Sequence, residues 1–148
     1  MPSVFTTRRN GASLAPYESL NLAQHVGDNA ETVARNRELL SKITGPIQFM
    51  NQVHGDEVVE VKSIGDDPTC DALITREPGI ALAVMVADCI PLLLSSSTVI
   101  GAVHVGRRGL MNSVAVKAVD AMRKLGADQI HAQLGPSICG RCYEVPQE

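Results

Sequence analysis

Apolar and polar residues alternate in two neighbouring segments near the middle of the chain. Residues 47–53 and 56–62 follow the pattern typical of β-strands, and His54-Gly55 lies at their junction. Short connections that contain glycine commonly join adjacent antiparallel strands. The pattern therefore predicts a β-hairpin with His54 at its tip.

A second pair of segments, residues 80–86 and 90–95, is almost wholly apolar. Continuous apolar runs of this length are typical of strands that are buried on both faces of a sheet. Ala87-Asp88-Cys89 interrupts the run, so we expect Cys89 to lie at the end of a strand.

The last third of the chain has the pattern of a βαβ unit. It predicts a strand over 98–105, a glycine-flanked turn over 106–109, a helix over 110–125 and a strand over 129–134. The two strands of such a unit are parallel, and the crossover between them is right-handed.

One further helix is predicted near the N-terminus, at about residues 29–42, after an irregular opening loop. Asp28, followed by Glu31, forms a capping box at its start. Together with the strand pairs and the C-terminal βαβ unit, this helix indicates an α/β (α+β) fold with mixed β-sheet layers flanked by helices. We expect residues 1–148 to form a single domain.

The composition indicates what the core is made of and which partners are excluded. Of the 148 residues, 45% are hydrophobic, but none is Trp and only two each are Tyr and Phe, so the core must be mainly aliphatic. The net charge of −3 leaves no basic surplus for a phosphate backbone. No segment approaches the ~20 apolar residues of a membrane span, and the first residues lack a signal-peptide pattern. We expect a cytoplasmic protein that binds neither nucleic acid nor membranes.

Three residues with metal-binding side chains stand at predicted strand ends: His54, Cys89 and His104. Zinc takes Cys and His ligands in tetrahedral geometry, and three protein ligands leave the fourth position open, as in catalytic sites. A metal-free alternative makes Cys89 a thiolate nucleophile and His104 its base. The simplest alternative is a buried thiol and two ordinary histidines. The loose spacing leaves all three open.

The turn Gly106-Arg107-Arg108-Gly109 lies between a predicted strand and a helix N-terminus. Free backbone N–H groups at such a position favour an anion, and two guanidinium groups would add to the attraction. A phosphate could bind there, although a surface turn with solvated arginines explains the pattern equally well.

Four cysteines are too few for a disulfide scaffold of this length, so each needs its own explanation. Cys139-Gly140-Arg141-Cys142 is formally a C-x-x-C motif, but no second pair completes a four-cysteine zinc site. A thioredoxin-like motif should open a helix, whereas Pro146 follows here. We expect this motif to serve packing or to form a loop near the active site.

Several motifs, taken together and in order, resemble those of one family. They include Asn51-Gln52-Val53-His54-Gly55, Ala87-Asp88-Cys89 and Val103-His104-Val105-Gly106-Arg107-Arg108-Gly109, with further matches at residues 19–22, 25–29, 70–72 and 135–145. Over essentially its whole length the chain is similar to the laccase-domain family. That family was formerly labelled multicopper polyphenol oxidases and is now regarded as purine nucleoside phosphorylases with adenosine deaminase activity.

The resemblance implies a zinc site in a pocket where nucleoside and phosphate meet. The family's zinc ligands match His54, Cys89 and His104, which would then also be the catalytic residues. Zinc is thus the expected cofactor, with copper as the alternative.

The resemblance also indicates substrate contacts. Arg8 and Arg108 match family arginines and are candidate phosphate or ribose contacts. Asp71, a carboxylate in the Cys70-Asp71-Ala72 motif, is a further candidate.

The implied function is phosphorolysis of adenosine, inosine and methylthioadenosine by a zinc-dependent purine nucleoside phosphorylase, with adenosine deamination as a side activity. The alternatives are a copper-dependent polyphenol oxidase, a Cys89/His104 amide hydrolase and an inactive nucleoside-binding domain. A multicopper centre needs many more histidines than the four in this chain.

The chain departs from the family pattern at a few positions. Arg107 stands where the family usually has tryptophan, Val105 replaces its alanine, Asn10 replaces a glycine, and Cys139-Gly140 replaces Gly-Pro. The family's chains also continue well beyond the Cys142-Tyr143-Glu144-Val145 motif. We therefore expect a C-terminally shortened version of the family fold.

Overall fold

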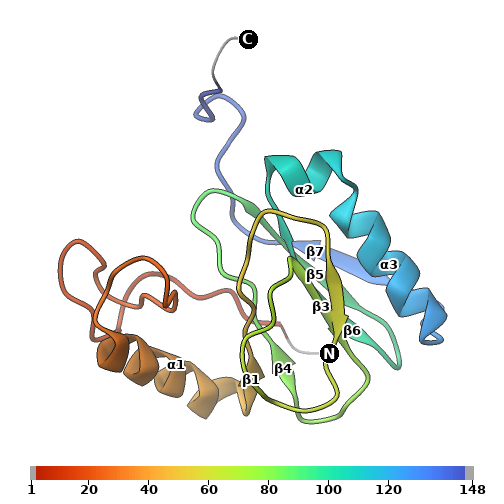
Figure 1. The fold of residues 1–148 in the computed structure, drawn as a ribbon, viewed down its shortest axis with the longest axis horizontal. Coiled ribbons are helices and arrows are strands. Elements are labelled where there is room, and N and C mark those ends of the chain that lie inside the picture. The colour runs from red at the N-terminus through yellow and green to blue at the C-terminus, as the bar shows by residue number, and fades with distance from the viewer. Residues whose placement is uncertain (1–2, 146–148) are drawn as a thin grey trace.

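The computed structural model describes residues 3–145, which form a five-stranded sheet, a two-stranded sheet and three helices (Figure 1). The five-stranded sheet has the order β2-β3-β6-β5-β7. Its strands are β2 (Val58–Glu60), β3 (Ala72–Thr75), β5 (Ile90–Ser95), β6 (Ile100–Val105) and β7 (His131–Leu134). The remaining elements are β1 (Ile47–Gln48), β4 (Ala81–Leu82), α1 (Ala30–Thr44), α2 (Arg107–Met111) and α3 (Val114–Lys124).

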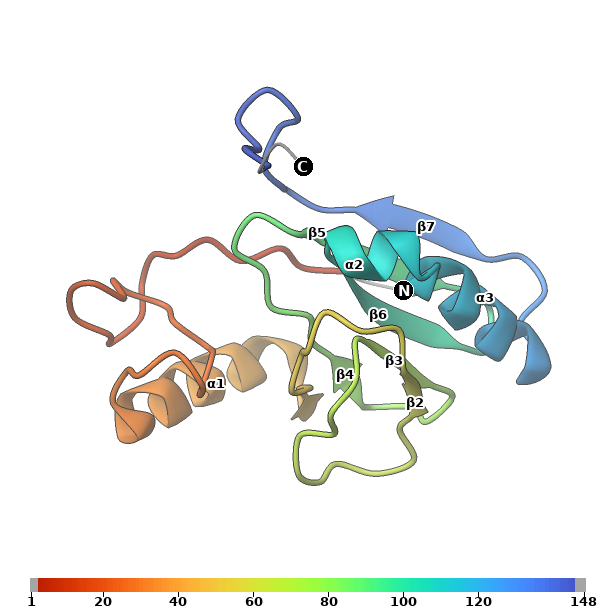
Figure 2. The ribbon, with the colours of Figure 1, turned by 45° about the horizontal axis from the view of Figure 1, so that its top comes forward.

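The larger sheet is mixed, because β2 pairs with β3 in parallel whereas β3–β6, β6–β5 and β5–β7 are antiparallel. Strands β6 and β7 are both antiparallel to β5, so they run parallel to each other with β5 between them. The helices α2 and α3 connect them and lie on one side of the sheet (Figure 2). The expected mixed sheet with flanking helices is therefore confirmed, as is the parallel direction of the two strands in the C-terminal unit.

The main core lies between α3 and the five-stranded sheet. Val114, Ala118 and Met122 recur every four residues along α3, which places them on one face of the helix, and all three are fully buried. They pack with Val99 and Val103 from the sheet side. The aliphatic core expected from the shortage of aromatic residues is confirmed.

The predicted hairpin over 47–53 and 56–62 is wrong. β1 pairs with β4 and β2 pairs with β3, both in parallel, so the two segments do not pair with each other. Alternating burial shows that a segment is half-buried but does not identify its partner strand.

The prediction that 80–86 is a strand buried on both faces is also wrong, and β4 and β5 belong to different sheets. Within 80–86 only Ala81–Leu82 is a strand, and residues 80–85 are half-buried rather than buried on both faces. β5 itself lies in the interior of the sheet, as expected for an apolar run.

The predicted helices are present, with two corrections. The helix predicted over 110–125 begins earlier, at Arg107, so the predicted turn over 106–109 is wrong, and the helix is divided into α2 and α3 at Ser113, whose backbone has φ 62° in the left-handed region. α1 begins one residue later than expected, because Asn29 rather than Asp28 accepts a hydrogen bond from the Thr32 N–H. Asp28 instead accepts hydrogen bonds from Ser13 and Asn21, which tie the opening loop to the start of the helix.

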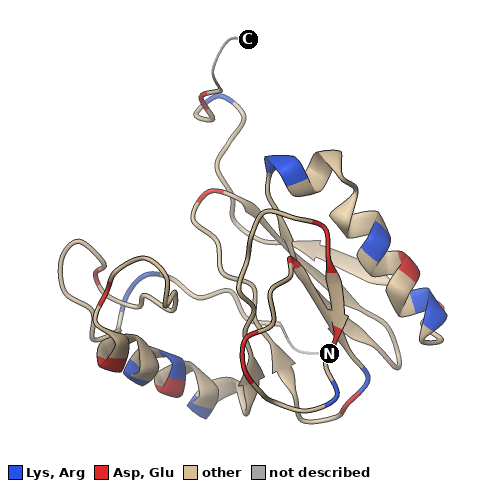
Figure 3. Cartoon of the chain, in the orientation of Figure 1, with Lys and Arg blue, Asp and Glu red and all other residues tan. Residues whose placement is uncertain are grey.

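Charged residues of both signs are interspersed along α1 and α3 (Figure 3). This arrangement agrees with the small net charge and offers no continuous basic stripe along either helix. Among residues 3–145, no helix is long and apolar enough to cross a membrane.

Candidate metal centre

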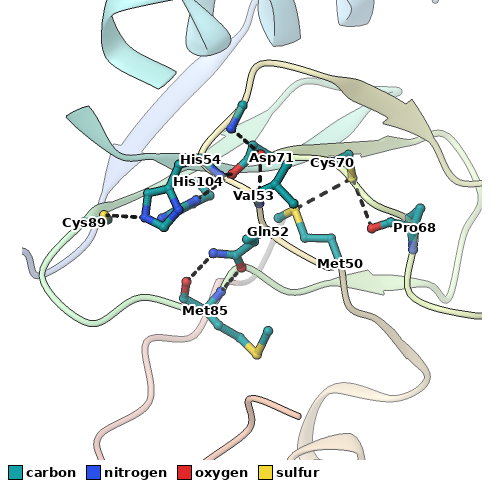
Figure 4. A network of polar contacts seen from close by, with 11 residues as sticks. Met50, Gln52, Val53, His54, Pro68, Cys70, Asp71, Met85, Cys89 and His104 are labelled. Atoms are coloured by element: carbon teal, nitrogen blue, oxygen red, sulfur yellow. Dashed lines mark hydrogen bonds and ion pairs between the residues drawn. The ribbon is translucent and has the colours of Figure 1, made fainter. Parts of the chain in front are cut away.

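His54, Cys89 and His104 converge at one edge of the larger sheet, and their ligand atoms all lie within 4.8 Å of one another (Figure 4). We call these three residues, which could hold a metal ion, the metal-ligand group. Cys89 Sγ lies 3.9 Å from His54 Nε2, and the two imidazole rings meet edge-on with their centroids 4.7 Å apart. The structure thus brings together all three residues that the sequence singled out.

The pairing of β5 with β6 explains why Cys89 and His104 meet. Cys89 immediately precedes β5, and His104 is the penultimate residue of β6. In the antiparallel register, Pro91 lies opposite His104 and Ile90 opposite Val105. The end of one strand therefore lies beside the start of the other.

Asp71 joins the two histidines of the group. Its Oδ1 accepts hydrogen bonds from His104 Nδ1 at 2.8 Å and from the His54 backbone N–H at 2.9 Å. Its Oδ2 accepts from the N–H groups of Gly55 at 2.7 Å and Val53 at 3.2 Å. Asp71 is fully buried, so the carboxylate fixes both the His54 loop and the His104 ring.

These hydrogen bonds determine the charge state of Asp71 and the tautomer of His104. Burial raises the pKa of Asp71, but hydrogen bonds from His104 and from the N–H groups of Gly55 and Val53 outweigh it, so the pKa lies below its ordinary value. An ionised carboxylate only accepts hydrogen bonds, so His104 Nδ1 is the donor. The Nε2 lone pair is then free to bind a metal, an arrangement common among metal-binding histidines.

The loop that carries His54 is held by a second polar residue, Gln52. The side-chain Nε2 of Gln52 donates to the Met85 carbonyl at 2.7 Å, and its Oε1 accepts from the Met85 N–H at 2.8 Å (Figure 4). His54 itself has φ 58°, in the left-handed region. Sequence reasoning missed the role of Gln52, because its partner is 33 residues away.

Gly106 allows the three ligands to approach one another. A Cβ atom at this position would lie 2.9 Å from His54 Cδ2 and 3.2 Å from Cys89 Sγ. Real Cβ atoms essentially never come this close to ring carbons. A side chain at residue 106 would therefore displace two of the three ligands.

The electrostatic environment of Cys89 favours the thiol when no cation is present. Burial raises its pKa, and the charges of Asp88 and Asp71 raise it further. A reactive thiolate needs the opposite environment, which argues against Cys89 as a nucleophile without a metal. One thiol and two imidazole nitrogens instead form a donor set of the kind that zinc and copper bind. The residues present thus fit a metal ion.

The metal-ligand group lies in the wall of a cavity of about 1020 Å³ between the opening loop and the two sheets. This volume is at the upper end of the range for small-molecule sites. Arg8 also lines the cavity, and its Nε donates to the Glu18 carbonyl at 2.6 Å. Tyr17 and His25 line it too, and sequence reasoning assigned neither a role.

The other two candidate substrate contacts lie elsewhere. Arg108 is exposed on α2 and does not line the cavity that holds the metal-ligand group. Asp71 has no exposed surface, and its oxygen atoms already accept four hydrogen bonds within the protein. The geometry makes Asp71 a residue that positions the ligands rather than one that contacts substrate.

Comparison with known proteins gives consistent results. Residues 2–148 match the family model described as multi-copper polyphenol oxidoreductase laccase. A Streptomyces coelicolor protein named purine nucleoside phosphorylase is 49% identical over 97% of this chain and 64% of its own length. A Streptomyces griseus protein of the same name is 46% identical over 97% of this chain and 63% of its own.

The solved structures agree with this result. The crystal structure of a Neisseria meningitidis protein of the DUF152 family superposes with a TM-score of 0.88 at 40% identity, over 95% of this chain and 59% of that one. The chain therefore spans about three fifths of the length of the relatives that it matches.

Proposed function

The chain belongs to the multi-copper polyphenol oxidoreductase laccase family, and on that premise we propose that it is a zinc-dependent purine nucleoside phosphorylase. Its substrates are inorganic phosphate and adenosine, inosine or methylthioadenosine. The observation that carries the proposal is the convergence of His54, Cys89 and His104 in the wall of a cavity large enough for a nucleoside. The names of the Streptomyces relatives support the same reaction.

In phosphorolysis a phosphate oxygen forms a bond to the ribose C1′, and the bond from C1′ to the base nitrogen breaks. The electron pair leaves with the base, which then takes up a proton. The reaction mainly requires that phosphate and nucleoside be held in line and that negative charge be balanced. Arg8 is the cationic side chain on the cavity wall, and we assign it to the phosphate.

The ligand set gives the zinc site its own role. His54, Cys89 and His104 would hold the ion, and the hydrogen bond from His104 Nδ1 to Asp71 would leave His104 Nε2 to bind it. When bound, zinc supplies Lewis acidity and lowers the pKa of a bound water to about 7, which suits a side activity that deaminates adenosine at C6. Arg108 remains a candidate contact only for a part of the substrate that extends outside the cavity.

Two other reactions are less well supported by the residues. A copper-dependent polyphenol oxidase agrees with the wording of the family description, but only two of the four histidines in the chain belong to the metal-ligand group. An amide hydrolase would need Cys89 as a thiolate, whereas its pKa is raised by burial and by neighbouring carboxylates.

The proposal is tested by elemental analysis of protein prepared without added metal and by chromatography of adenosine incubated with and without phosphate. We expect bound zinc, and adenine formed only when phosphate is present. Cys89→Ala should lose both the zinc and the phosphorolysis. Cys142→Ser, which removes an exposed thiol outside the metal-ligand group, should retain both.

Each other outcome identifies a different function. Cys89→Ala with zinc retained and activity lost would favour a nucleophilic Cys89. Copper together with oxidation of phenols, and no adenine, would favour the oxidase. Folded protein without metal and without turnover would leave only nucleoside binding.

A further inference from the structure

Two cysteines that the proposed function does not use lie side by side in the segment after β7. Cys139 Sγ and Cys142 Sγ are 3.1 Å apart, and both residues are exposed. The backbone between them forms a turn in which the N–H groups of Cys142 and Tyr143 donate to the Cys139 carbonyl at 2.9 and 3.1 Å. We call residues 139–142 the dithiol turn.

The two thiols of the dithiol turn differ in acidity. The Cys142 thiol lowers the pKa of Cys139, and the backbone N–H groups of Arg141 and Cys142 lower it further. The same contact raises the pKa of Cys142. One thiol is therefore suited to act as the attacking thiolate and the other to resolve the mixed disulfide that forms.

The remaining two thiols are in different environments. Cys70 is buried, and burial raises its pKa to about 11. Cys89 is half-buried, its pKa is also raised, and it belongs to the metal-ligand group. Exposure, proximity of a second thiol and a lowered pKa thus coincide only at the dithiol turn.

We propose that Cys139 and Cys142 form a redox-active pair that exchanges with low-molecular-weight disulfides. The Cys139 thiolate attacks one sulfur of the small disulfide, forms a mixed disulfide and releases the first small thiolate. Cys142 then loses its proton and attacks Cys139 Sγ, which closes the intramolecular disulfide and releases the second small thiolate. One disulfide is consumed and one is formed, so no further oxidant is needed.

The dithiol turn is also fixed to the loop that carries a metal ligand. The Ile138 N–H donates to the Asp88 carbonyl at 2.9 Å. Ile138 directly precedes Cys139, and Asp88 directly precedes Cys89. Upstream, the Gly135 N–H donates to the Pro91 carbonyl at 2.9 Å. The segment that leads into the dithiol turn is therefore hydrogen-bonded to the chain both before and after Cys89.

The test treats the zinc-loaded full chain with oxidised glutathione and follows the product by intact mass and peptide mapping. We expect the loss of two hydrogens, a disulfide that links Cys139 to Cys142, and full reversal by dithiothreitol. Cys142→Ser should stop at the glutathione mixed disulfide. Cys139→Ser should react more slowly near neutral pH, because Cys142 lacks the backbone N–H groups that lower the pKa of Cys139.

Three results would overturn the proposal. The first is a disulfide that involves Cys70 or Cys89 in the wild-type chain. The second is that oxidised glutathione reacts with Cys139→Ser as fast as with Cys142→Ser. The third is the loss of bound zinc from the double serine variant, which would make the pair a metal site. Circular dichroism of each variant confirms that it is folded, and phosphorolysis is not required for any readout.

Discussion

The metal-ligand group and the dithiol turn both present sulfur, but they are built in opposite ways. The metal-ligand group collects residues that are 35 and 15 positions apart in the sequence, and a buried carboxylate and a glycine hold them in place. The dithiol turn needs only four consecutive residues and lies at the surface. The first site therefore depends on the whole sheet, whereas the second depends on a local turn. Substitutions that disturb one should leave the other unchanged.

The largest effect is expected from Asp71→Asn. The new NH₂ group would face N–H groups that now donate to Asp71, which leaves part-buried donors without an acceptor. Breaking a buried charged network of this kind costs about 3 kcal/mol of unfolding free energy, and loss of such a partner weakens metal binding by roughly 10–100-fold. Urea denaturation and competition with a zinc chelator measure the two effects.

The control for this variant is Asp66→Asn, which removes the same charge from an exposed position. It should change neither stability nor zinc affinity. Equal losses in Asp66→Asn and Asp71→Asn would show that net charge, rather than the hydrogen bonds of Asp71, is responsible.

A pair of glycine substitutions separates the two sites directly. Gly106→Ala places a methyl group against His54 and Cys89 and should cost about 1–3 kcal/mol together with much of the zinc affinity. Gly140→Ala lies in the dithiol turn, where a Cβ atom would meet nothing within 4 Å. Thermal unfolding with and without zinc should therefore show no change for Gly140→Ala, and equal behaviour of the two variants would contradict the assigned crowding at Gly106.

Acidification should have a smaller effect, through the contribution that Asp71 makes to the unfolding free energy. The pKa of Asp71 in the folded chain lies below its ordinary value of 3.8. Ionised Asp71 therefore contributes its full share of the unfolding free energy at pH values above 3.8. This contribution is lost as the pH falls from about 4 through the pKa of Asp71 in the folded chain. Metal-free wild-type protein should lose stability more steeply over this range than metal-free Asp71→Asn, and parallel curves would rule out this contribution.

The smallest effect is expected from the double variant Cys139→Ser, Cys142→Ser. Both side chains are exposed, so the unfolding free energy of the reduced protein should change by less than about 0.5 kcal/mol. Zinc content should also stay the same. A large loss of stability on urea denaturation would mean that the turn takes part in the core packing.

The sequence predicted the membership of the metal-ligand group better than the architecture that forms it. His54, Cys89 and His104 were identified because residues at strand ends tend to meet at one edge of a sheet, and the structure confirms their convergence. The hairpin that should have presented His54 does not exist, because β1 and β2 take parallel partners that are distant in the sequence. Residue type and local pattern identified the three candidates, and the family resemblance indicated them as ligands, but pairing between distant strands has no local signal.

The supporting residues show the same division. Asp71 was noted as a carboxylate near the motifs, but its four hydrogen bonds arise from contacts across 16 to 33 positions and could not be read from its neighbours. Gln52 was missed for the same reason. The C-x-x-C motif was visible, but Pro146 argued against a helix after it, and the motif was assigned to packing or to a loop near the active site. The turn needs only local hydrogen bonds to place its sulfurs together.

The antiparallel register of β5 and β6 determines on which face of the sheet His104 lies. Successive residues of a strand point to opposite faces, so a slip of β6 by one residue along β5 would reverse the facing of one strand relative to the other. His104 would then point to the face covered by α3, away from Cys89. The connection between Ser95 and Ile100 can therefore change in length only where its turn keeps Pro91 opposite His104, and a library of loop lengths selected for zinc retention should recover the variants that preserve this register.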